Sequence, residues 1–183
     1  MGIFVPLFAL QAIDRLDLMV FVIFGAFTGV YGRVPGYANR LVAQSKAGGL
    51  FLAVILAAAL ASHYLVNHED PAASAWMIVG LTTVVSGICS VLTGFLQLRP
   101  GGSLFHIFAF AAIASMPHQP LLAESMAAAL GAVLFAIVLG FSGTLFAKGT
   151  SWGPYVAPAP LSRPVRLAIW NEALLYLLAA GLA

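Results

Sequence analysis

Long apolar stretches separated by short polar or Gly/Pro-rich links make up most of the sequence. The clearest stretch, residues 47–66, has the roughly 20 residues that a helix needs to cross a hydrocarbon core about 30 Å thick. The other runs cover residues 3–13, 18–31, 73–96, 103–116 and 121–147, and a last run covers 167–183. This pattern predicts an all-α fold, a polytopic transmembrane helix bundle with about six spans and the start of a further helix.

The links between the runs divide the chain into three parts. Residues 1–147 are predicted to form the transmembrane helical bundle, residues 148–166 a cytoplasmic Pro-rich linker, and residues 167–183 the start of a further transmembrane helix. Three of the runs are short. Run 3–13 either lacks its beginning or forms one helix with run 18–31. Runs 18–31 and 103–116 either extend into their flanks or form partial spans that are buried against other helices.

The composition makes lipid the natural solvent of this chain. Its residues are 62% hydrophobic and 8% charged, and its mean hydropathy is +1.02. A soluble domain carries roughly 25% charged residues, so this chain has too few to cover a globule with a polar surface. The lipid bilayer is therefore the first partner that we expect.

Charges alternate in sign from one link to the next. Basic residues lie in three links, as Arg33, Arg40 and Lys46, then Arg99, then Lys148, Arg163 and Arg166. Five of the six acidic residues lie in the alternate links, as Asp14, Asp17, Glu69, Asp70 and Glu124, with Arg15 as the one cation among them. Because cytoplasmic loops are rich in Lys and Arg, links 31–46, 97–102 and 148–166 are predicted to be cytoplasmic. The orientation points to a multi-pass protein of a bacterial plasma (inner) membrane.

Small residues four apart occur inside several runs. Gly25 and Gly29 form a G-x-x-x-G, and Ala127 with Gly131 has the same spacing. Such spacing lets two helices approach closely. Ordinary helix packing is the simpler interpretation, and a gate or a dimer face is the alternative.

Candidate chemistry is sparse and mostly cationic. The basic residues Arg33, Arg40 and Arg99 serve either as a topology signal that also attracts anionic lipid, or as a cationic vestibule that concentrates anions. His106 lies inside run 103–116, where an ionisable group either marks a pathway or is a neutral imidazole bonded to a neighbouring helix. Arg99 precedes that run, so a helix start near it would offer free N–H groups to an anion.

Asn171 and Glu172 lie within the last apolar run. A carboxylate at membrane depth is costly unless it is paired or lies near an interface. Glu172 is therefore either a coupling residue of a further helix bundle or a residue close to the lipid headgroups.

No catalytic signature is present in the sequence. It has no G-x-x-x-x-G-K-[ST], no Rossmann glycine set, no H-E-x-x-H and no G-x-S-x-G. Cys89 is the only cysteine, and His63 and His68 lack the spacing of a metal site. We therefore expect no enzyme, no cofactor, no metal site and no nucleic-acid partner.

Three stretches carry a family resemblance. They are FGAFTGVYGRVPGYANRLVAQSKAGGLFLAVILAAAL at 24–60, TGFLQLRPGGSLFHIFAF at 93–110 and AAALGAVLFAIVLG at 127–140. Together they resemble the membrane half of the fusaric-acid-resistance-like (FUSC-type, aromatic acid exporter) proteins. That family usually has two blocks of about six helices, so the resemblance implies that residues 167–183 begin a second block. Because the sequence ends there, we expect either a fragment of a longer protein or a one-block version that pairs with another copy or another subunit. In a related plant group of malate-transporting channels, which work as dimers, basic residues line the pore.

The resemblance implies a transporter or exporter of small organic anions, aromatic or other carboxylates. Its substrate-binding residues would be Arg33, Arg40 and Arg99 at the cytoplasmic mouth, with His106 deeper. The alternative is a non-transporting structural or accessory subunit of a larger membrane complex. In either case the expected protein partners are a second copy of the chain, a second membrane block or other membrane subunits.

Overall fold

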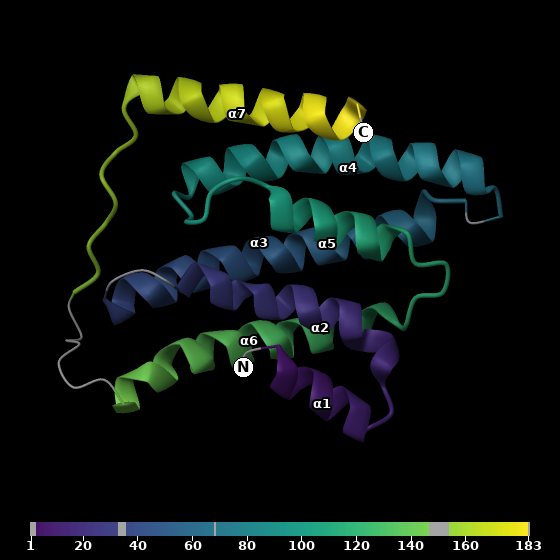
Figure 1. The fold of residues 1–183 in the computed structure, drawn as a ribbon, viewed down its shortest axis with the longest axis horizontal. Helices are drawn as coiled ribbons and strands as arrows, with labels where there is room; N and C mark the ends of the chain where they lie inside the picture. Colours follow the sequence, from purple (N-terminus) through teal and green to yellow (C-terminus); the bar gives the residue numbers. More distant parts are fainter. Residues whose placement is uncertain (1–2, 33–35, 68, 147–153, 183) are drawn as a thin grey trace. The chain divides into compact units, whose positions relative to one another are not determined.

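The computed structural model describes residues 3–32, 36–67, 69–146 and 154–182, and the regular elements among them are all helices (Figure 1). In chain order they are α1 (Phe4–Ala12), the 3-10 helix η1 (Leu16–Leu18), α2 (Met19–Ala26), the 3-10 helix η2 (Phe27–Gly32), α3 (Tyr37–Tyr64), α4 (Pro71–Phe95), α5 (Leu104–Ala114), α6 (Leu122–Phe146) and α7 (Arg163–Leu182).

Four of these helices, α3, α4, α6 and α7, are long and apolar enough to cross a membrane, by length and composition. The all-α prediction is confirmed for the described residues, and the chain has the character of a polytopic helical membrane protein. Six full spans are not established. The apolar helical stretches Leu16–Gly32 and Leu104–Ala114 are shorter, and the second would reach only about 16 Å at 1.5 Å per residue.

Two helices begin at least four residues earlier than their apolar runs. Helix α3 begins at Tyr37 instead of residue 47, and α7 begins at Arg163 instead of residue 167. Link 31–46 is therefore helical over its second half. A helix satisfies its own backbone hydrogen bonds whatever its side chains are, so it continues through polar residues, whereas the run stops at the first of them.

The chain folds as two compact units. Unit 1 comprises Met1–Ala53 and Pro120–Ala157. In it α2 packs on α6, and the contact is closest at Gly25, which is buried against the backbone of Ala129. The first half of α3 packs against α6 and η2, since Gly48 faces both Val133 and Thr28.

Charged and polar contacts mark the two ends of α6 in unit 1. Near its start, Glu124 accepts a 2.5 Å hydrogen bond from Nη2 of Arg15. Near its other end, the carbonyl oxygen of Gly140 accepts a 2.8 Å bond from Nη1 of Arg40. At 1.5 Å per residue, Glu124 and Gly140 are about 24 Å apart along the helix. The turn at residues 14–17 and the start of α3 therefore lie at opposite ends of unit 1.

Unit 2 comprises Val54–Gln119 and Pro158–Ala183. Its main contact is between α4 and α7, which lie side by side and antiparallel (Figure 1). Gly94 faces the side chain of Ile169, and Gly87 faces that of Leu177. Helix α5 packs on α4 from another side. Asp70 caps α4 by accepting 3.1 Å hydrogen bonds from the backbone N–H groups of its first turn.

Candidate functional site

Arg40 is the predicted site residue with the most specific environment. It lies in the first turns of α3, where it is half-buried, and its guanidinium carbon lies 5.4 Å from the centre of the Tyr37 ring. Nη1 donates to the carbonyl of Gly140 at 2.8 Å. Nε is buried and has no hydrogen-bond partner among the described residues. The guanidinium therefore keeps unused donor capacity inside the protein.

Gln44 continues this polar site one turn further along α3. Its side chain is 1% exposed, and its Oε1 finds no partner within the described part of the chain. It fits because two glycines face it. A Cβ at Gly32 would lie 2.6 Å from Nε2, and one at Gly140 would lie 2.7 Å from Oε1. Gln44 has no signal in the sequence, because residues 31–46 have the pattern of a link, where a glutamine needs no explanation.

No acid neutralises Arg40. All six acidic residues of the chain are described, and both ion pairs that they form there belong to Arg15. Arg15 lies 3.0 Å from Asp17 and 2.5 Å from Glu124, and these hydrogen bonds raise its pKa. Arg15, the one cation among the acidic links, is thus fully matched by acids. Arg40 carries a net charge close to the protein interior, where an uncompensated charge is costly.

Of the other predicted site residues, one lies outside the described residues and two belong to the other compact unit. Arg33 lies outside the described residues. Arg99 and His106 belong to unit 2, whereas Arg40 belongs to unit 1. Arg99 is exposed and joined to Pro100 by a cis peptide bond, and His106 is completely buried on α5. Arg99 and His106 therefore do not share a surface in unit 2.

Several hydroxyl groups are buried in unit 2, mostly along α4. Ser86 donates to the carbonyl of Thr83 at 2.8 Å, and Thr93 donates to that of Ser90 at 3.1 Å. Hydroxyls that bond back to their own helix have little need of another partner. Bonds to their own helix therefore account for these two hydroxyls, whereas those of Thr82 and Ser90 on α4 are buried with no hydrogen-bond partner among the described residues. None of these groups carries a charge, so they offer weaker grounds for an anion site than Arg40 does.

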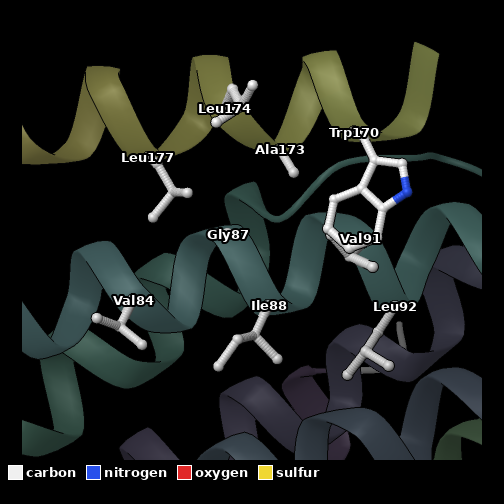
Figure 2. Close-up of a pocket in the computed structure, with 9 residues that line it drawn as sticks. All are labelled: Val84, Gly87, Ile88, Val91, Leu92, Trp170, Ala173, Leu174 and Leu177. Carbon is white, nitrogen blue, oxygen red and sulfur yellow. The ribbon is translucent and has the colours of Figure 1, made fainter. Parts of the chain in front are cut away.

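A groove of about 410 Å³ runs between α4 and α7 of unit 2. Figure 2 shows Trp170 and Leu92 at one end of it and Val84 and Leu177 at the other. Its lining consists of Val84, Gly87, Ile88, Val91, Leu92, Trp170, Ala173, Leu174 and Leu177. These residues offer apolar surface and no charge, so the groove suits a hydrocarbon chain and not the charged end of an anion.

The described residues contain no group of three or more His, Cys, Asp or Glu side chains that could hold a metal ion. The fold thus defines a class, an all-helical arrangement over the described residues with four helices long and apolar enough to cross a membrane. Comparison with protein-family models, curated proteins and solved structures finds no match. The FUSC-type resemblance stays a prediction from the sequence.

Proposed function

We propose that this chain is an inner-membrane transporter or exporter of small organic anions, aromatic or other carboxylates, as the FUSC-type resemblance implies. The observation that carries the proposal is the half-buried guanidinium of Arg40, which no acid of the chain neutralises. A guanidinium binds a carboxylate through two parallel charge-assisted hydrogen bonds. A passing anion would supply the charge that Arg40 lacks.

The position of Arg40 on α3 strengthens this reasoning. The first turn of a helix favours anions because its free N–H groups carry partial positive charge. The first turn of α3 contains no acid, and Arg40 follows directly after it. A cation near the start of α3 is repelled by the partial positive charge of the helix end. An anion bound there is attracted both by the helix end and by the guanidinium of Arg40.

The remaining predicted residues keep subsidiary roles in the proposal. Arg99 and Arg33 would attract anions electrostatically at the cytoplasmic mouth, as the positive-inside orientation implies. His106 would act at greater depth as a hydrogen-bond partner of the substrate. In this orientation links 31–46, 97–102 and 148–166 face the bacterial cytoplasm.

Flux of radiolabelled carboxylates in proteoliposomes that contain only this chain tests the proposal. We expect flux above empty vesicles, and a loss of at least about tenfold in Arg40→Ala, because a hydrogen bond to a charged group contributes about 1.5–3 kcal/mol. Arg40→Lys should retain part of the flux, since it keeps the charge and loses the fork. Arg99→Ala tests the proposed attraction at the mouth.

Arg163→Ala is the matched control, because it removes the same charge from an exposed position at the start of α7. Equal flux in Arg40→Ala and Arg163→Ala would remove Arg40 from the mechanism. Absence of flux from inserted, folded protein would contradict transport by this chain alone. It would favour the second candidate, an accessory subunit of a larger membrane complex. The exposure of α7 also supports that candidate, because only 11% of its most apolar 18-residue segment is buried and the rest could contact another subunit.

A further inference from the structure

Helix α7 turns one side to α4 and leaves the other uncovered within unit 2 (Figure 1). Its buried residues are Ile169 and Ala173, which face α4. The opposite side carries large exposed side chains, with Leu175 at 66% and Leu178 at 59% exposure. Lipid tails solvate apolar side chains, so a uniformly apolar surface would need no protein partner.

Asn171 and Glu172 interrupt that apolar surface halfway along the helix. Counting 100° per residue, they lie about 160° and 100° around the helix axis from Ala173, so neither is directed at α4. Both side chains are exposed, and neither has a hydrogen bond or ion pair with another described residue. Lipid tails can satisfy neither an amide nor a carboxyl group.

We propose that α7 binds α7 of a second copy of this chain, with Asn171 of each copy donating a hydrogen bond to Glu172 of the other. Copies of one membrane protein insert in the same orientation, so a two-fold axis along the membrane normal brings equal depths of α7 together. Asn171 and Glu172 differ in depth by only about 1.5 Å. The donor of one copy therefore meets the acceptor of the other, twice.

The placement of charges favours a second copy over an ion pair within the chain. The cations of α7 itself, Arg163 and Arg166, lie about 9–13 Å from Glu172 along the helix axis. In a parallel pair they lie equally far from the partner's Glu172. Asn171 is the group of complementary chemistry at the right depth, and amide and carboxyl side chains are known to join helices in membranes. The inference is independent of transport.

Disulfide cross-linking in membranes tests this arrangement. Two differently tagged copies are co-expressed in a Cys89→Ala background, which removes the only native thiol. A cysteine is introduced at Leu175, next to the polar pair on the outer side of α7. The matched control carries Leu134→Cys on α6, which is 53% exposed and also apolar. We expect a cross-linked product that carries both tags for Leu175→Cys, and none above background for Leu134→Cys.

Substitutions of the polar pair then test its chemistry. Glu172→Leu and Asn171→Leu should each weaken association of the purified chain in lipid vesicles by about tenfold, measured by energy transfer between labelled copies. Glu172→Gln should retain most of it, because the amide oxygen still accepts. These positions are outside the α4 contact, so the far-UV circular dichroism should not change. Unchanged association in Glu172→Leu, or cross-linking of Leu175→Cys to a different polypeptide, would overturn the proposal.

Discussion

The contact of Gly25 with α6 offers a direct test of the packing in unit 1. A Cβ at Gly25 would lie 2.6 Å from the carbonyl oxygen of Ala129 and 3.0 Å from Cβ of Ala132. Favourable contacts between carbon atoms begin at about 3.5 Å. One of the obstructing atoms is backbone, so Gly25→Ala forces α2 and α6 apart instead of turning a side chain.

The expected magnitude follows from two opposing terms. Overpacking of a close contact costs about 1–3 kcal/mol, and Gly→Ala in a helix returns up to about 1 kcal/mol through helix propensity. Gly25→Ala should therefore lower the free energy of unfolding by about 1–2 kcal/mol. Gly131→Ala is the matched control on α6, because a Cβ there meets nothing within 4 Å. It should be neutral or stabilising.

The free energies of unfolding of Gly25→Ala and Gly131→Ala can be measured by titrating each purified protein from mild detergent micelles into sodium dodecyl sulfate. Far-UV circular dichroism follows the loss of helix. Gly29→Ala is a second reference, since its Cβ would make an ordinary 3.8 Å contact with Ala136. The reasoning fails if Gly25→Ala is as stable as Gly131→Ala. It also fails if Gly29→Ala is the more damaging of the two substitutions in the G-x-x-x-G.

Three other perturbations probe separate contacts. Asp70→Ala removes the cap of α4 and should cost about 1 kcal/mol of unfolding free energy, whereas Asp70→Asn should cost much less. Arg15→Ala should lower the unfolding midpoint modestly at low salt and hardly at all at 1 M salt, because exposed ion pairs are screened; equal effects at both salt concentrations would contradict this. Gly94→Leu should destabilise the α4–α7 contact by about 1–3 kcal/mol in the same titration, while Gly80→Leu, which enters open space on α4, should not.

The longest helices could be predicted from the sequence because hydrophobic length alone encodes them. Runs 73–96 and 121–147 correspond closely to α4 and α6. The start of α3 could not be predicted in this way. Residues 37–46 are mostly too polar for lipid, yet Tyr37 and Gln44 are buried against protein in the structure. Hydropathy measures compatibility with lipid and does not report burial against other helices.

The spacing of small residues also does not show which of these motifs contacts a neighbouring helix. Gly25 and Gly131 both have partners four residues away, but only Gly25 of these two meets a neighbouring backbone. Which glycine is in contact depends on the packing of α2 against α6, which one sequence does not encode locally. The candidate site shows the same limit. Arg40 was predicted from its charge, but Gln44 becomes noticeable only once Gly32 and Gly140 are seen to face it.

The two units are interleaved along the chain, and this has a consequence for biosynthesis. Unit 1 needs α6, which follows α3 by nearly sixty residues that mostly belong to unit 2. At about 5–20 residues per second, α2 and α3 leave the ribosome about 3–12 s before α6 does. During that interval the surfaces of Gly25 and Gly48 that later receive α6 are without their partner. A newly made chain thus passes through a stage at which the translocation machinery or lipid must shield these surfaces, and slower translation lengthens it.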